Sequence, residues 1–155
     1  MKGGKKMKIN QCMSQDVCFV KPDCKVYDAA RIMCENHIGC IPVCNENRNV
    51  IGIITDRDIL LRTVACDKDT KTTIVGDIMT TDVCTCGFEQ NIGEAQQQMA
   101  KHQIRRLPVV DEKNQMVGIL TIGDLARNTQ DIGQNVFSAT MQNICNCEGT
   151  VKNNG

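Results

Sequence analysis

The sequence predicts a mixed α/β (α+β) fold of two pseudo-symmetric repeats, packed through their sheets, with a C-terminal helical segment. Three observations carry this prediction. The chain aligns with itself without a gap at a constant offset of 66 residues, so that Met13 falls on Met79 and Asp58 on Asp124. Within each half, short continuous apolar runs alternate with apolar residues spaced three or four apart. Only 3% of the residues are aromatic, which indicates an aliphatic core. Each repeat reads strand-helix-strand-strand-helix.

The first two elements of each repeat are a short extended run and a helix. The extended runs are Val17–Val20 and Val83–Cys86, which are rich in β-branched residues and cysteine. The helices are expected from about Val26 to Asn36 and from about Ile92 to His102. Apolar residues recur there at three- and four-residue spacing, as on the buried face of a helix.

Two apolar strands and a final helix complete each repeat. Near-continuous apolar strands between helices indicate a sheet covered on at least one face. Pro42 and Pro108 lie inside two of these runs, and proline lacks a ladder donor, so those strands are expected to be edges or to end there. The final helices begin at Asp56 or Ile122. The strands are expected at Cys40–Cys44, Val50–Ile54, Arg106–Val110 and Met116–Leu120.

Short segments connect and flank the repeats. Ile74–Met79 is expected to be a short helix that enters the second repeat, and Ile9–Met13 to play the same part for the first. A further helix is expected at Val136–Ile144. The predicted organisation is a flexible N-terminus (1–8), repeat one (9–66), repeat two (74–130), a helical extension (131–148) and a disordered tail (149–155).

The charge balance excludes several partners. Lys plus Arg and Asp plus Glu both number 18, and there is no Trp, so neither an electrostatic footprint nor a stacking platform for nucleic acid is visible. No apolar stretch approaches the ~18 residues that a membrane span needs. The N-terminal lysines are followed by no apolar segment of the kind found in signal peptides. We therefore expect a cytoplasmic protein with no nucleic-acid or membrane partner.

Eleven cysteines suggest either a structural or a chemical role. Cys44 aligns with Val110 and Cys34 with Ala100, so most thiols are interpreted as small buried hydrophobes in a reducing compartment. The alternative is a redox or metal-binding protein that uses a C-x-C pair. The candidate pairs are Cys84/Cys86 and Cys145/Cys147, of which the second is the less explained.

A Thr-x-x-Asp motif occurs at the strand-to-helix junction of each repeat. The motif residues are Thr55 and Asp58 in the first repeat and Thr121 and Asp124 in the second. One interpretation is a capping box, in which Thr caps the helix and the acid bonds back to the backbone of Thr. This spacing alone favours that purely structural interpretation.

The same geometry also suits a nucleotide. A helix start offers free N–H groups to phosphate, the Thr hydroxyl adds a donor, and the carboxylate can accept both ribose hydroxyls. Gly52 and Gly118 would let a flat ring approach the strand closely. The apolar neighbours that could sandwich the ring are Ile41, Ile53, Leu107 and Ile119. Arg57, Arg105 and Arg106 could neutralise phosphates, or they could be solvated surface charges.

These motifs, repeated in the same order, resemble the CBS (cystathionine-β-synthase) domain. The resemblance rests on Ile38–Val43 and Ile104–Asp111, followed by Gly-Ile-hydrophobic-Thr-x-x-Asp, and it extends from about Ile9 to Asn128. A tandem pair of this kind is called a Bateman module. The resemblance implies a protein that binds an adenosyl ligand such as AMP, ADP, ATP, NAD or S-adenosylmethionine in clefts between the repeats. It also implies a homodimer.

By position, the resemblance assigns the candidate site residues. Asp58 and Asp124 match ribose-binding acids, and Thr55 and Thr121 match phosphate-contacting hydroxyls. The residues that match the base pocket are Val17, Cys18, Phe19, Ile41, Pro42, Val83, Cys84, Thr85, Leu107 and Pro108. The family often has Thr or Ser in the first strand. Thr85 keeps this feature but Phe19 does not, so the two sites are expected to differ.

The sequence thus predicts a non-catalytic regulatory sensor of adenine nucleotides that acts on an unknown protein target or through its dimer. No catalytic residue and no metal site are expected, because no phosphate loop, acid pair or triad signature is present. Two alternatives stay open. One is the cysteine-based redox or metal-binding protein, and the other is a structural dimerisation module with empty clefts.

Overall fold

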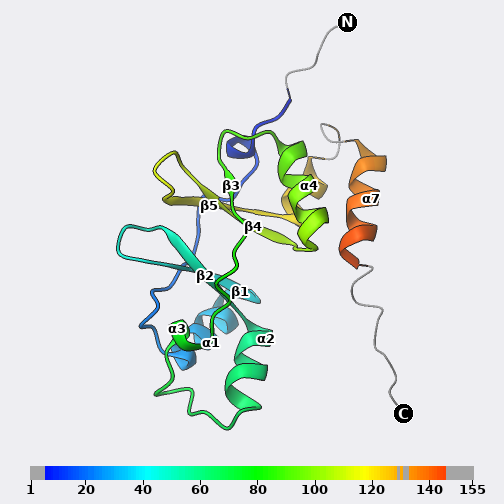
Figure 1. Cartoon of the computed structure of the whole chain (residues 1–155). Coiled ribbons are helices and arrows are strands. Elements are labelled where there is room, and N and C mark those ends of the chain that lie inside the picture. Colours follow the sequence, from blue (N-terminus) through cyan, green and yellow to red (C-terminus); the bar gives the residue numbers. More distant parts are fainter. Residues whose placement is uncertain (1–5, 129, 131–132, 146–155) are drawn as a thin grey trace, which may run out of the picture. The chain divides into compact units, whose positions relative to one another are not determined.

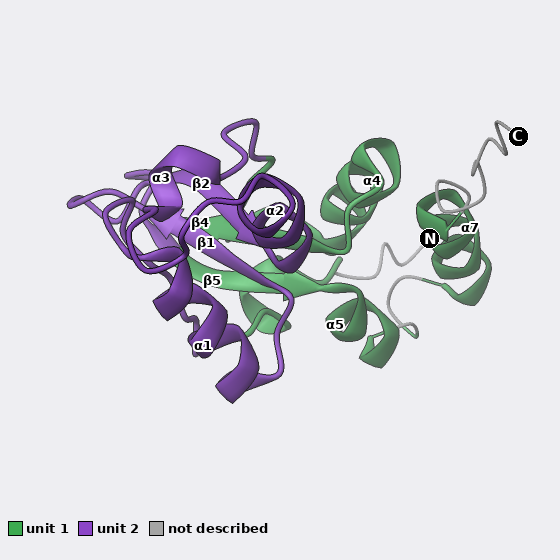
Figure 2. Ribbon diagram, turned by 90° about the horizontal axis from the view of Figure 1, so that it is seen from below, with its two compact units in different colours: residues 1–15, 84–111, 117–155 green, residues 16–83, 112–116 purple. Residues whose placement is uncertain are grey.

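The computed structural model describes residues 6–128, 130 and 133–145 and forms two compact units (Figures 1 and 2). Unit 1 contains residues 1–15, 84–111 and 117–155, and unit 2 contains residues 16–83 and 112–116. The units do not coincide with the sequence repeats, because the first residues of each repeat, 9–15 and 74–83, lie with the elements of the other repeat. The repeat limits derived from the sequence therefore stay a prediction.

Unit 2 is built on an antiparallel pair of strands. In that pair Val43 lies opposite Gly52, and an irregularity follows at Cys44. Val20 adds a single parallel bridge to Val43. The elements are α1 (Val26–Asn36), β1 (Cys40–Cys44), β2 (Val50–Thr55), α2 (Asp56–Ile59), the π-helical turn η2 (Leu60–Val64) and α3 (Val75–Ile78).

Unit 1 contains a sheet with the strand order β3-β4-β5, in which β3 and β4 are parallel. Strand β5 begins at Met116, which is grouped with unit 2. Helix α7 lies alongside α4 (Figure 1). The elements are the 3-10 turn η1 (Ile9–Gln11), β3 (Cys86–Gly87), α4 (Ile92–His102), β4 (Arg106–Val110), β5 (Met116–Thr121), α5 (Ile122–Arg127) and α7 (Gln134–Cys145).

Equivalent helices end in the same backbone conformation. His37 after α1 and Gln103 after α4 both have φ 53°, the left-handed conformation that closes a helix C-terminus. The two hairpin turns match as well, because Arg48 and Asn114 both have φ 61°. At the start of α4, the Asn91 side chain accepts the Glu94 N–H at 3.1 Å. The repeat in the sequence is thus a repeat in backbone geometry.

Each unit has an aliphatic core, as the composition predicts. The core residues are apolar side chains from the sheet and from the helix that covers it. In unit 1 they are Ile9, Cys86, Ile92, Ala95, Met99, Leu107, Val109, Leu120, Leu125 and Ile144. In unit 2 they are Val20, Val26, Ala29, Met33, Ile41, Val43, Ile54, Val75 and Ile78.

The extended run that opens each repeat is shorter than predicted. Val17–Phe19 forms no strand and Val20 makes only an isolated bridge, while the second run pairs only at Cys86 and Gly87. The prediction that Pro108 marks an edge strand is wrong, because β4 is the middle strand of its sheet. Strand β3 pairs with β4 only at Val109 and Val110, so the missing proline N–H breaks no ladder bond with β3.

The interpretation of most cysteines as buried hydrophobes is wrong in the described residues. Cys44 and Cys86 are buried, whereas Cys34, which aligns with Ala100 and was expected to be buried, is exposed on α1. Within residues 6–128, 130 and 133–145, Cys12, Cys18, Cys24, Cys34, Cys44, Cys66, Cys86 and Cys145 are free thiols, and no three His, Cys, Asp or Glu side chains form a metal-ligating group. Cys147 and the predicted tail lie outside the described residues. No helix in the described ranges has the length and apolarity of a membrane span.

Candidate functional site

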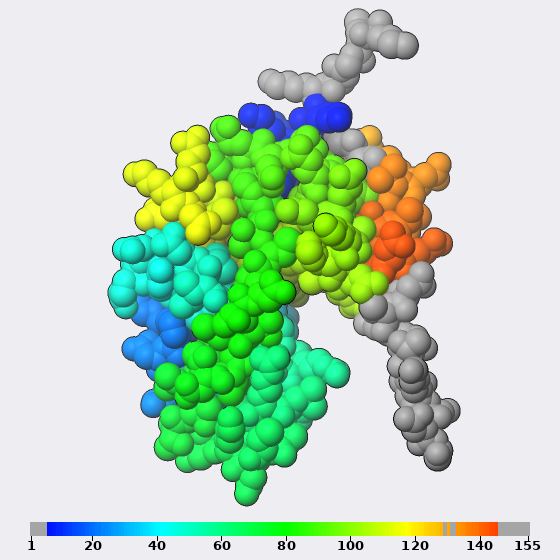
Figure 3. Space-filling view, in the orientation of Figure 1, coloured from blue at the N-terminus to red at the C-terminus, as the bar shows by residue number. Residues whose placement is uncertain are grey.

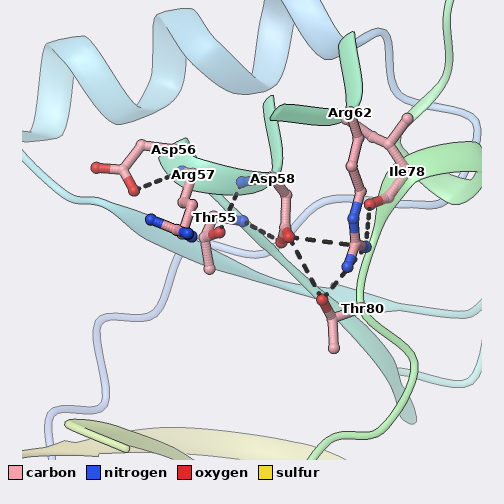
Figure 4. Close-up of polar contacts among 7 residues, drawn as sticks. All are labelled: Thr55, Asp56, Arg57, Asp58, Arg62, Ile78 and Thr80. Atoms are coloured by element: carbon pink, nitrogen blue, oxygen red, sulfur yellow. Dashed lines mark hydrogen bonds and ion pairs between the residues drawn. The ribbon is translucent and has the colours of Figure 1, made fainter. Parts of the chain in front are cut away.

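The first candidate site lies in unit 2, where β2 meets α2 (Figure 4). Thr55 and Asp58 form a capping box: the Thr55 Oγ1 accepts the Asp58 N–H at 3.0 Å, and the Asp58 Oδ2 accepts the Thr55 N–H at 3.0 Å. This satisfies N–H groups that have no partner inside the helix. The structural interpretation of the motif is therefore confirmed, and the carboxylate has a fixed position.

The other oxygen of Asp58 faces two groups that the sequence interpretation missed (Figure 4). The Thr80 hydroxyl donates to Asp58 Oδ1 at 3.5 Å, and Arg62 Nη1 lies 3.6 Å from the same oxygen. Arg62 is itself held by the Ile78 carbonyl, to which it donates at 2.8 Å. The spacing of Arg62, four residues after Asp58 on one helical face, is the signal that could have found it.

The second candidate site lies in unit 1, where β5 meets α5. The Asp124 Oδ2 accepts the Thr121 N–H at 2.8 Å and the Thr121 hydroxyl at 3.0 Å, and the Asp124 N–H donates to Thr121 Oγ1 at 3.2 Å. Arg127 donates to the other oxygen, Oδ1. Arg127 stands three residues after Asp124, another spacing at which helical side chains meet. Both sites therefore hold their acid with a Thr and an Arg.

Both acids are buried, with Asp58 8% and Asp124 4% exposed. A buried carboxylate needs partners, and Thr and Arg provide them here. The charge of Asp124 also acts on the Cys12 thiol. Burial is the larger cause and the charge of Asp124 the smaller one, and together they raise the pKa of this thiol to about 11. A carboxylate has about four lone-pair positions, so each acid keeps acceptor capacity beyond its present bonds. Each site thus keeps at least one acceptor position for a further hydroxyl donor at a fixed place.

Protein atoms fill the space beside the two motif glycines. A Cβ on Gly52 would lie 2.4 Å from Met79 Sδ, and one on Gly118 would lie 2.7 Å from Met13 Sδ. The backbone is close as well, since Ile53 bridges Thr80. These glycines therefore allow a neighbouring chain segment to approach closely, where the sequence predicted a ligand ring.

The predicted base-pocket residues differ in accessibility. Ile41 and Leu107 are 0% exposed core residues, and Pro42 and Pro108 beside them are buried. Cys18 is exposed. The remaining residues are partly exposed. In unit 2 they are Val17, Phe19, Ile53 and Val83, and in unit 1 they are Cys84, Thr85 and Ile119. The accessible residues of unit 2 thus belong to the same unit as Asp58, and those of unit 1 belong to the same unit as Asp124.

The predicted phosphate-binding arginines differ in accessibility. Arg57 is exposed, and its backbone N–H donates to Asp56 Oδ1 at 2.7 Å (Figure 4). Arg105 is exposed and Arg106 half-buried in unit 1. A fourth arginine, Arg48, was missed: its guanidinium lies 5.2 Å from the centre of the Phe19 ring.

Comparison with known proteins identifies one family. The CBS domain matches the chain twice, at residues 9–64 and 75–131. The CBS domain-containing protein YhcV of Bacillus subtilis is 38% identical over 139 residues, covering 88% of this chain and 97% of YhcV. Two solved structures share the fold. Hypoxic Response Protein I, solved with two coordinated zinc ions, is 31% identical with a TM-score of 0.72, covering 78% of this chain and 98% of that one. CBSX2, solved in complex with AMP, is 29% identical with a TM-score of 0.69, covering 82% and 98%.

Proposed function

Because the chain belongs to the CBS-domain family and carries the domain twice in tandem, we propose that it is a non-catalytic regulatory protein that binds an adenosyl ligand. The observation that carries the proposal is the pair of anchored, buried carboxylates, Asp58 and Asp124, each at the first turn of a helix. The AMP complex of CBSX2 supports adenosine as the recognised group.

In this proposal each part of the ligand has a partner. The acceptor positions left on Asp58 and Asp124 bind ribose hydroxyls, and the hydroxyls of Thr55 and Thr121 lie at helix starts that favour phosphate. The accessible apolar residues of each unit contact the base, with Phe19 in the first site and Thr85 in the second. This difference in side chains predicts different affinities at the two sites.

The candidate ligands are AMP, ADP, ATP, NAD and S-adenosylmethionine. Regulation follows if the ligand binds one conformation more tightly than another, since only that difference shifts a population. We propose that the change is passed to a protein target or through a homodimer. An exposed apolar row on η2 supports self-association, because Leu60, Leu61 and Val64 are 56%, 46% and 58% exposed.

Titration calorimetry with each candidate ligand tests the proposal on the full chain. Asp58→Asn and Asp124→Asn keep an acceptor for the cap but lose the charge, so each should weaken binding at its own site by about 10- to 100-fold. Asp56→Asn is the matched control, since Asp56 is an exposed carboxylate in the same turn and accepts its neighbour's N–H. Unchanged affinity in both site variants would remove the ribose role.

A parallel measurement separates the alternatives. Mass spectrometry of the small molecules that co-purify with the protein identifies a retained nucleotide, and elemental analysis measures bound zinc. Zinc is included because Hypoxic Response Protein I was solved with two zinc ions. Stoichiometric zinc without any nucleotide affinity would favour metal binding over the proposed sensor.

A further inference from the structure

Unit 1 contains a cavity of about 260 Å³ that is separate from the capping-box site. It lies between the N-terminal segment, the first half of α4 and helix α7, which runs beside α4 in Figure 3 (orange beside yellow-green). The cavity reaches the surface, because some of its lining residues, Lys6 and Gln97 among them, are exposed. The lining residues are Lys6, Met7, Asn91, Ile92, Gly93, Gln96, Gln97, Ala100, Val136 and Thr140.

One lining side chain, Gln96, is 2% exposed and only half satisfied. Its Nε2 donates to Thr140 Oγ1 at 2.6 Å, and that hydroxyl donates onward to the Val136 carbonyl at 2.9 Å. The hydroxyl proton is thus committed to Val136, which fixes the orientation of the Gln96 amide. The other amide atom, Oε1, is buried without a hydrogen-bond partner. A buried acceptor without a partner costs about 1–3 kcal/mol, so a ligand group that donates a hydrogen bond to this oxygen would remove that cost.

The charges at the cavity favour an anion. Lys6 lines it, and the first turn of α4 supplies the positive end of the helix dipole. Within that turn the Ile92 N–H donates to the Met7 carbonyl and the Glu94 N–H to the Asn91 side chain. Gly93, between them, lines the cavity with no side chain to cover its backbone. No carboxylate lines the cavity in the described residues; Glu94, the acid of this turn, is exposed and lies outside the lining.

The spacing of these groups defines the shape of a ligand. Gly93 and Gln96 are three residues apart and share one helical face, and side chains on a helix tilt toward its N-terminus. An acceptor for a donor group therefore lies next to the anion-binding end. Ala100 continues the face one turn further on, and Val136 of α7 lies opposite. The remainder of the lining offers aliphatic contacts from Met7 and Ile92.

From this arrangement we propose that the cavity binds a short aliphatic α-hydroxy acid. Its carboxylate lies at Lys6 and the start of α4, its hydroxyl donates to Gln96 Oε1, and its aliphatic chain contacts Ala100 and Val136. An α-amino acid fits worse, because its ammonium group would face Lys6 and the helix dipole with no lining carboxylate to balance it. This site is independent of the proposed adenosyl sites, since it uses none of their residues.

Calorimetry with the full chain and three probes tests the ligand class. We expect α-hydroxyisocaproate to bind and isocaproate, which lacks the donor, to bind about 3- to 10-fold more weakly. The uncharged α-hydroxyisocaproamide should also bind more weakly. Equal affinity for α-hydroxyisocaproate and isocaproate, or no binding of α-hydroxyisocaproate at millimolar concentration, would overturn the proposal.

Two variants test the residues. Gln96→Met keeps the length of the side chain but removes the acceptor, so it should abolish the preference for α-hydroxyisocaproate over isocaproate. Gln97→Met, an exposed neighbour in the same turn, should leave that preference intact. Lys6→Met should weaken the binding of both acids equally, and it provides a second test if Gln96→Met does not fold. Unchanged affinity for the acids in Lys6→Met, or an unchanged preference in folded Gln96→Met, contradicts the proposal.

A structural readout completes the test. Because Gln96 is on α4 and Val136 on α7, a bound acid should tie the two helices together and slow amide hydrogen exchange in residues 134–145. AMP titration of Gln96→Met should match the wild type. Faster or unchanged exchange in α7 at saturating α-hydroxyisocaproate would place that acid elsewhere.

Discussion

Thr121 and Asp124 satisfy each other's backbone N–H groups, at 2.8 Å from Thr121 N to Asp124 Oδ2 and 3.2 Å from Asp124 N to Thr121 Oγ1. Thr55 and Asp58 make the same reciprocal pair, with both distances at 3.0 Å. The structural and the functional interpretations of the motif are therefore compatible. The cap fixes the carboxylate at the helix start, which is where the proposed ribose would need it.

The cap should be measurable in stability. Thr121→Val removes the hydroxyl that accepts the Asp124 N–H, and we expect a loss of about 1 kcal/mol in the free energy of unfolding. Thr121→Ser keeps the hydroxyl and should lose much less. Urea unfolding followed by circular dichroism measures both, and an equal loss in the two variants would argue against a capping role.

The close approach at Gly118 predicts a steric cost. A Cβ there would lie 2.9 Å from the Ser14 carbonyl oxygen as well as 2.7 Å from Met13 Sδ, and a backbone atom cannot move aside cheaply. Gly118→Ala should therefore destabilise by about 1–3 kcal/mol. Gly87→Ala is the matched control, because its nearest contact would be an ordinary 3.6 Å from Gln90 Cγ. Similar melting temperatures for both variants would contradict the contact.

Replacement of His37 by glycine is expected to increase the stability of the protein. His37 is exposed and closes α1 in the left-handed conformation, which costs roughly 1–2 kcal/mol for a residue with a Cβ. His37→Gly removes this cost but gains entropy in the unfolded chain, so the net increase should be about 0.5–1 kcal/mol. Asn36→Gly, inside the helix, should instead lower stability. Thermal unfolding of the two variants side by side shows whether their shifts have opposite signs.

The buried thiol of Cys86 and the partly buried thiol of Cys12 predict a dependence of stability on pH. Burial raises the pKa of Cys86 to about 12, and burial with the charge of Asp124 raises that of Cys12 to about 11. An unperturbed thiol has a pKa of 9.0, so below pH 9 the folded and unfolded states both keep the proton, and these thiols add no pH dependence to stability. Above this pH the unfolded chain releases protons that the folded chain retains, and stability falls as the pH rises from about 9 toward 11–12.

Urea unfolding at pH values on either side of 9 measures this fall, and Cys86→Ala should show a smaller one than the wild type. Iodoacetamide provides a second measurement, since it reacts with the thiolate. Exposed Cys145 should be alkylated much faster than Cys86 in the folded protein. Equal rates for Cys86 and Cys145 in the folded state would contradict the burial of Cys86.

Sequence by itself determined the two long helices α1 and α4 and the Thr-x-x-Asp motif. The bounds of α1 and α4 follow from apolar spacing, and Thr-x-x-Asp identified both capping boxes, because helix periodicity and caps depend on residues within one or two turns. The 66-residue offset carried these local assignments from one repeat to the other.

Tertiary structure alone decided which chain segments and which side chains meet. The first residues of each repeat lie with the elements of the other, so Met13 and Met79, rather than a ligand ring, fill the space beside Gly118 and Gly52. The tertiary structure also placed Thr80 next to Asp58, and among the described residues it left the buried Oε1 of the cavity-lining Gln96 without a hydrogen-bond partner. Such contacts join residues far apart in the chain, and no local pattern encodes them, because they depend on how packed elements share space.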